Sequence, residues 1–135
     1  MSFNWKDYIR LAEDLIKYNK EAYFRSGISR AYYGVFCLSR NKAGFKDYRF
    51  YWNYVKEIKK NYKNKNRHVS VHEALVNYYE SSKDPKEQSV GKILDELRKN
   101  RNDADYNEDK VIDFRLAQRV LLKSKEILKE LGIVL

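Results

Sequence analysis

Proline and glycine are scarce in this sequence, and their scarcity constrains the fold more than any other feature. The chain has one proline, Pro85, and five glycines among 135 residues. Both residue types interrupt helices, because proline lacks a backbone N–H and glycine loses much conformational freedom on folding. The sequence therefore favours long, uninterrupted helices. A chain of this length suffices for one domain with its own core, which we expect to span residues 1–135.

Apolar residues recur every three or four positions along most of the chain, which is the spacing of one helix face. The pattern predicts an all-α fold with no strand and no internal repeat. The expected helices cover residues 4–19, 21–42, 47–62, 69–82, a segment from about 89 to 106, and 107–131. The only proline lies in an expected loop at 81–88. We therefore expect five or six helices, and a compact up-and-down bundle built from about five of them.

Capping residues mark several of the expected helix ends. Asn4 and Asn107 are suited to begin the first and the last helix. Gly44 and Gly132 are suited to end the second and the last. Inside the second helix stand four small residues: Ser26, Gly27, Ser29 and Gly34. Because glycine costs about 1 kcal/mol against alanine in a helix, we expect another helix, or a ligand, to approach closely there.

The formal net charge of +9 indicates an affinity for polyanions, of which nucleic acid is the commonest in a cell. Cations concentrate in residues 56–67, with one tyrosine among them. Four of these cations, together with one from the second helix, are the predicted RNA contacts: Lys59, Lys60, Lys63, Arg67 and Arg30. The alternatives are a composition rich in lysine and asparagine without a binding role, and a mobile, solvated loop.

Several classes of protein and site are not expected. No apolar run approaches the roughly 20 residues of a membrane span, and the first residues lack a signal-peptide pattern. The single cysteine, Cys37, cannot form an internal disulfide, so we expect a cytoplasmic protein. His68 and His72 are four residues apart, but no third ligand has matching spacing. We therefore expect no metal site and no cofactor.

The segment at residues 94–106, LDELRKNRNDADY, places a charge on an apolar helix face. Leu94, Leu97 and Arg101 share that face at a period of 3.6 residues. A guanidinium there is costly to desolvate unless it has a partner or reaches a wet cleft. Asp105, one turn later, is a possible partner. On the neighbouring face, Tyr106 follows an asparagine by one turn.

Two segments of the chain resemble the family of small HEPN-domain proteins. Residues 25–37 read RSGISRAYYGVFC and residues 97–106 read LRKNRNDADY. The resemblance covers about a sixth of the chain and implies a bundle of four or five main helices that forms a homodimer. It also implies a link to RNA or nucleotides in toxin–antitoxin, antiphage or CRISPR-associated systems. The implied partners are a nucleotidyltransferase antitoxin or a larger effector protein.

Active members of this family are metal-independent ribonucleases whose motif is an arginine, an adjacent polar residue and a histidine four to six residues after the arginine. The resemblance assigns the first two positions to Arg101 and Asn102, while Tyr106 stands where the family has histidine. An arginine can stabilise the charged phosphorane formed during cleavage. A tyrosine, with an ordinary pKa of about 10, is a poor base at pH 7 but can donate a hydrogen bond or a proton.

Two functions follow from the resemblance. The first is a ribonuclease that uses Arg101, Asn102 and Tyr106. The second is a catalytically degenerate module that binds RNA, a nucleotide or a protein. A purely structural role for the cluster is also open, with Arg101 paired to Asp105 and Tyr106 closing the end of the bundle.

Overall fold

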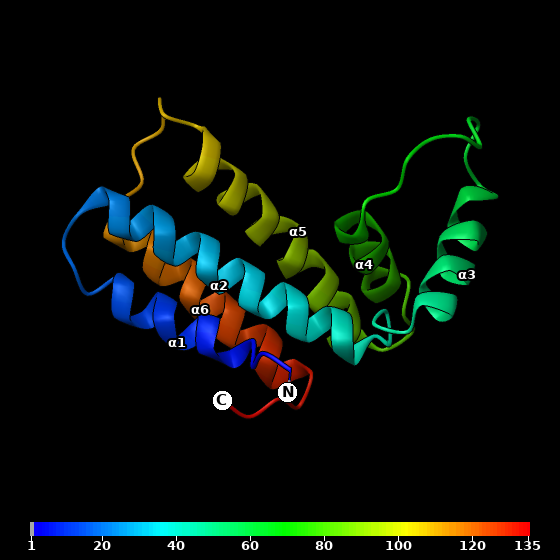
Figure 1. The fold of residues 1–135 in the computed structure, drawn as a ribbon, viewed down its shortest axis with the longest axis horizontal. Coiled ribbons are helices and arrows are strands. Elements are labelled where there is room, and N and C mark those ends of the chain that lie inside the picture. Colours follow the sequence, from blue (N-terminus) through cyan, green and yellow to red (C-terminus); the bar gives the residue numbers. More distant parts are fainter. Residues whose placement is uncertain (1) are drawn as a thin grey trace.

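The computed structural model describes residues 2–135, which form six α-helices and no strand (Figure 1). The helices are α1 (Lys6–Leu15), α2 (Glu21–Lys42), α3 (Tyr48–Lys59), α4 (Val71–Glu80), α5 (Pro85–Tyr106) and α6 (Phe114–Glu130). The all-α prediction is confirmed. The expected count of about five helices is corrected to six, of which four form the bundle. Within the described residues, no helix is both long and apolar enough to cross a membrane.

Four of the helices make a bundle, with α2 packed against α1, α5 and α6. In Figure 1, α1 and α5 run in one direction, and α2 and α6 run in the other. The remaining two helices lie at the far end of α2, where α4 packs on α5. Among the described helices, α3 packs only on α4, and in Figure 1 it stands apart from the bundle.

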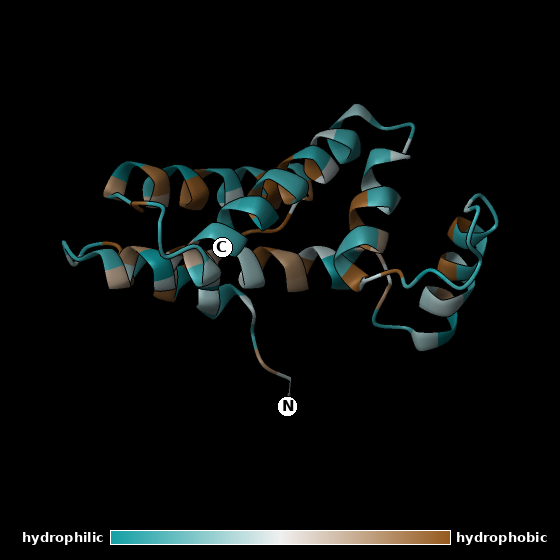
Figure 2. Ribbon diagram, turned by 90° about the horizontal axis from the view of Figure 1, so that it is seen from above, coloured by the Kyte–Doolittle hydropathy of each residue, from teal (hydrophilic) through white to brown (hydrophobic). Residues whose placement is uncertain are grey.

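The core lies between the bundle helices and continues to buried residues of α3 and α4. Ile9, Ile28, Leu94 and Leu97 are among its most buried residues. In Figure 2, apolar residues recur at intervals along the helices, while the connecting loops are mostly hydrophilic. Burial of these side chains, rather than helix propensity alone, therefore holds the short helices in place.

The boundaries of α2 agree with the prediction, and glycine ends it as expected. Gly44 has a φ of +86°, and the backbone N–H of Phe45 donates to the carbonyl of Arg40. The same arrangement ends α6, where Gly132 has a φ of +70°. Both positions require a left-handed backbone conformation, which glycine adopts without strain.

The last two helices begin elsewhere than expected. The α5 helix starts at Pro85 rather than near residue 89, because Asp84 accepts a hydrogen bond from the Lys86 N–H and caps it. Proline is well suited to the first helical turn, where its missing N–H has no partner to lose. Asn107 does not cap α6. Asp113 does so, by accepting from the Leu116 N–H.

Three other helices are shorter than predicted. The α1 helix ends at Leu15, and α3 runs from Tyr48 to Lys59 with Asp47 as its cap. The α4 helix begins only after Ser70, whose hydroxyl accepts from the Glu73 N–H. The Ser70 cap therefore decided the start of α4, where the apolar pattern alone extended too far.

Helix–helix contact explains two of the small residues of α2. An added Cβ at Gly27 would lie 2.6 Å from Cγ2 of Ile16, and one at Gly34 would lie 2.8 Å from Cδ1 of Ile9. The approaching element is α1 and the residue that follows it. The expected close approach at these two glycines is therefore confirmed, and its cause is a helix of the same chain.

Candidate functional site

Arg101 lies in the core-facing row of α5, as the spacing predicted. Leu94 and Leu97 are 1% exposed, and Arg101 is 7% exposed. It is one of three buried polar or charged residues in the described chain, and the other two are serines. Burying a guanidinium is unfavourable unless other groups replace its hydration, so its surroundings decide what it can do.

Two aromatic rings of α2 and one carboxylate surround the Arg101 guanidinium. Its central carbon lies 5.5 Å from the ring centre of Tyr32 and 5.2 Å from that of Tyr33. The nearest carboxylate oxygen, on Asp105, is 3.9 Å from Nη1 and also accepts a hydrogen bond from Ser29. The predicted pairing with Asp105 is therefore present, but the separation is too long for a hydrogen bond.

The Arg101 guanidinium makes no hydrogen bond to any residue between 2 and 135. Its Nε is fully buried and without a partner. An arginine offers five N–H donors in a planar fork that matches the oxygens of phosphate or carboxylate. A mostly buried cation with its donors unused is suited to receive an anion from outside the chain.

A histidine from α4 completes the cluster. Nδ1 of His72 is hydrogen-bonded to the hydroxyl of Tyr32. The imidazole stacks on Phe36 with ring centres 4.1 Å apart, and on Tyr32 with centres 5.5 Å apart. The cluster therefore joins α2, α4 and α5 through side chains that are far apart in the sequence.

Burial and positive charge keep His72 neutral. Desolvation, with a smaller effect from the nearby guanidinium groups of Arg98 and Arg101, lowers the pKa of His72 to about 4. Burial raises the pKa of the Tyr32 hydroxyl, although Arg101 partly opposes this. At pH 7 both groups are therefore neutral, and the imidazole tautomer sets which of the two donates the hydrogen bond between them.

The other two predicted catalytic residues lie on a different part of the α5 surface. Asn102 is exposed, and Tyr106 is 76% exposed. Five residues of helix rotate Tyr106 by about 140° from Arg101. Tyr106 therefore does not close the end of the bundle, and it lies outside the ring cluster around Arg101.

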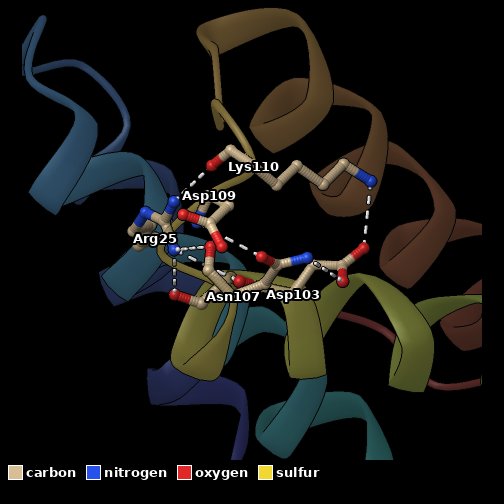
Figure 3. Close-up of polar contacts among 6 residues, drawn as sticks. Arg25, Asp103, Asn107, Asp109 and Lys110 are labelled. Atoms are coloured by element: carbon tan, nitrogen blue, oxygen red, sulfur yellow. Dashed lines mark hydrogen bonds and ion pairs between the residues drawn. The ribbon is translucent and has the colours of Figure 1, made fainter.

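Arg25 of α2 holds the end of α5 in place (Figure 3). Its guanidinium donates to the backbone carbonyls of Asp103, Ala104 and Asn107 at 3.0–3.2 Å, and to that of Lys110. The Lys110 ammonium in turn binds the Asp103 carboxylate at 2.9 Å. One arginine thus caps the helix C-terminus and fixes the loop that follows.

The predicted basic segment lies at the opposite end of the molecule from this loop (Figure 1). Arg67 pairs with Glu73 at 3.2 Å and lies 4.5 Å from the ring centre of Tyr62. Lys60 pairs with Glu57, and Lys63 is exposed. The segment is therefore anchored to α4 at one point and presents lysines to solvent.

The remaining predicted contacts do not gather with either group. Arg30 lies over the Tyr8 ring of α1 at 5.1 Å and is exposed. His68 lies in the loop before α4, whereas His72 lies in the first turn of that helix.

Sequence reasoning missed the neighbours of Arg101. Tyr32 and Tyr33 stood in a family motif without a role, and His72 was considered only as a metal ligand. A usable signal was present, because His72 shares a helix face with the buried residues Leu75 and Tyr79. That face had to turn toward another helix.

Comparison with known proteins adds no relative on which to base a function. No family model matches the chain, and neither a curated protein nor a solved structure matches it. A functional hypothesis therefore rests on the chemistry of the Arg101 cluster, on the charge of the chain and on the sequence resemblance.

Proposed function

We propose that this protein acts on RNA as a HEPN-family, metal-independent endoribonuclease of a toxin–antitoxin or defence system, with Arg101 binding the phosphate that is cleaved. The observation that carries the proposal is the nine-tenths buried side chain of Arg101, whose guanidinium has no hydrogen-bond partner within residues 2–135. The net charge of +9 supports a polyanionic substrate.

The proposed reaction needs no metal. The ribose 2′-oxygen attacks the adjacent phosphorus, the bond from phosphorus to the 5′-oxygen breaks, and a 2′,3′-cyclic phosphate remains. The proton of the 2′-hydroxyl passes to water, and the leaving 5′-oxygen takes a proton from an acid. Arg101 stabilises the negative charge on the phosphorane, Asn102 orients the phosphate or the attacking hydroxyl, and Tyr106 is the proposed acid.

A homodimer is part of this proposal. Asn102 and Tyr106 lie on the exposed surface of α5, away from the Arg101 rings. If two copies of α5 face each other across a two-fold axis, both sets of side chains line one shared cleft. A nucleotidyltransferase antitoxin or a larger effector is the proposed protein partner.

One observation favours the second candidate, a non-catalytic module that binds RNA, a nucleotide or a protein. Tyr106 stands at the histidine position of the motif, and the histidine that does lie near Arg101 has a pKa lowered to about 4. A base of that strength accepts a proton poorly at pH 7. The same Arg101 site would then bind a phosphate without cleaving it.

Incubation of labelled RNA with pure protein in EDTA distinguishes the two functions. Arg101→Ala should abolish cleavage, and Tyr106→Phe should slow it. Arg119→Ala is the matched control, because that arginine is exposed and pairs with Glu96. Cleavage that survives in folded Arg101→Ala would refute the ribonuclease, and RNA bound but left intact by the wild type would establish the binding module.

A further inference from the structure

A cavity of about 480 Å³ opens beside the Arg101 cluster and shares His72 with it. It lies between the last turns of α2, the segment that leads into α3, and the first turn of α4. Its lining consists of aromatic, cationic and aliphatic side chains: Phe36, Arg40, Phe45, Lys46, Tyr51, Val71 and His72. No residue of this lining is acidic.

Four ring-bearing side chains form the aromatic part of the lining: Phe36, Phe45, Tyr51 and His72. Phe36 and His72 stack with an angle of 16° between their planes, and Phe45 meets Tyr51 edge to face at 5.2 Å. Phe45 is itself packed against Tyr54 and Tyr78, with ring centres 5.3 and 5.4 Å away, so its position is fixed. Such rings bind nucleobases by stacking, with little dependence on sequence.

The charges of the cavity favour an anion. Arg40 donates only to the neutral amide oxygen of Asn41, and Lys46 is exposed. Neither cation makes an ion pair within the described part of the chain. His72 adds the ring nitrogen Nε2, because its Nδ1 is hydrogen-bonded to the Tyr32 hydroxyl. The cavity therefore combines aromatic rings with unpaired cations and a neutral ring nitrogen.

We propose that this cavity binds one nucleotide, with its base against Phe45 and Tyr51 and its phosphate on Arg40 and Lys46. An aromatic heterocycle that carries a phosphate is the ligand whose two parts match the two kinds of lining. That the nucleotide belongs to an RNA strand rests on the proposed function. Tyr32 connects this cavity to the Arg101 site, because it contacts both His72 and Arg101.

Binding of AMP, GMP, CMP and UMP, and of short RNA oligonucleotides, to the full chain tests the proposal by calorimetry. Arg40→Gln and Tyr51→Ala should each weaken binding at least tenfold, and Arg119→Gln should leave it unchanged. Arg40→Gln keeps the test valid if Tyr51→Ala unfolds the protein, because it removes a charge from the edge of the cavity. Binding that is unaffected by folded Arg40→Gln would overturn the proposal, as would the absence of binding to all probes.

The ribonuclease proposal and the nucleotide-site proposal can be refuted separately. Arg101→Ala should retain mononucleotide binding while it loses cleavage. Cleavage without any nucleotide binding would refute the cavity proposal alone, and binding without cleavage would support it while refuting the nuclease. Tighter binding of oligonucleotides than of mononucleotides would identify RNA as the ligand of the cavity, and equal binding would identify a free nucleotide as that ligand.

Discussion

The Tyr32 hydroxyl of α2 is hydrogen-bonded to Nδ1 of His72 on α4, and this contact joins the Arg101 cluster to the aromatic cavity. On one side, the Tyr32 ring lies 5.5 Å from the central carbon of the Arg101 guanidinium. On the other side, His72 forms part of the wall of the aromatic cavity. A change at either residue therefore acts on both features.

The folded protein should lose stability as the pH falls from about 6.5 to 4. The pKa of His72 is lowered from 6.5 to about 4, chiefly by burial and then by Arg98 and Arg101. In that interval the unfolded chain binds a proton that the folded chain does not, so the free energy of unfolding decreases with falling pH. The decrease should be roughly 2–3 kcal/mol, since one pKa unit corresponds to about 1.4 kcal/mol.

Urea unfolding at several pH values measures this effect, and His72→Phe isolates it. Phenylalanine keeps the stacking on Phe36 but cannot be protonated. The wild type should therefore have the steeper pH dependence between 6.5 and 4, while titrating carboxylates affect both proteins alike. Parallel curves for the two proteins would show that His72 is not held neutral.

Arg101→Met should abolish the cleavage of RNA without weakening the fold. The guanidinium is buried without a hydrogen bond, and methionine fills similar space without its desolvation cost. Removal of the cation–π interactions with Tyr32 and Tyr33 opposes this gain by about 0.5–1 kcal/mol each. The free energy of unfolding should remain within about 1 kcal/mol of the wild type in urea. A decrease above about 3 kcal/mol would mark Arg101 as a structural residue.

Arg25→Met should destabilise the end of α5. Four backbone carbonyls would be deprived of a charged donor, and the expected decrease in stability is roughly 2–3 kcal/mol, because water replaces part of the interaction. Arg10→Met is the control, since its pair with Asp7 is exposed and should contribute less than about 0.5 kcal/mol. Hydrogen exchange in residues 103–113 should also become faster. Equal effects of the two substitutions would contradict the capping role.

Gly91→Ala should destabilise the contact between α4 and α5. An added Cβ would lie 2.7 Å from the backbone nitrogen of Glu80 and 3.1 Å from the carbonyl oxygen of Val76. The two helices must move apart, at a cost of about 1–3 kcal/mol in thermal or urea unfolding. Ser89→Ala, two residues earlier on α5, should change stability by less than about 0.5 kcal/mol. If Gly91→Ala leaves the free energy of unfolding unchanged, α4 can move away from α5 without cost.

The basic segment should contribute salt-sensitive binding if it contacts RNA. Lys63→Gln should reduce the slope of log affinity against log salt by about 0.7–0.9 for each phosphate that the protein no longer neutralises. Lys92→Gln, an exposed lysine on α5, provides the comparison. Anisotropy titrations between roughly 50 and 300 mM salt give both slopes. Identical slopes for Lys63→Gln and the wild type would show that the segment is a solvated loop that does not contact RNA.

Structural features that depend on the local periodicity of apolar residues were predicted from the sequence. The burial of Arg101 followed from its register with Leu94 and Leu97, and the extent of α2 followed from its apolar face and from Gly44. The start of α5 was missed because Pro85 was interpreted as a loop residue, although proline suits a first helical turn. The apolar periodicity indicates which face of a helix is buried, while capping residues and other individual residues determine where the helix begins and ends.

The neighbours of Arg101 depend on contacts that periodicity does not contain. Tyr32 and His72 lie 40 residues apart in the chain and meet only because α2 and α4 pack together. The spacing of Arg101 and Tyr106 along α5 suggested a joint site, yet the helix turns them to different sides. Such relationships are set by tertiary packing, which one sequence encodes only indirectly.

The limited attachment of α3 has a thermodynamic consequence. This helix packs only on α4 among the described helices, so its opening should require less free energy than global unfolding. Tyr51 of α3 is also a wall of the aromatic cavity. Anything that occupies the cavity must therefore shift the equilibrium toward docked α3, by RT ln(1 + [L]/Kd). Ligand binding in the cavity and the local opening of α3 are then linked equilibria. The extent to which this least firmly attached helix opens therefore depends on whether the ligand is bound.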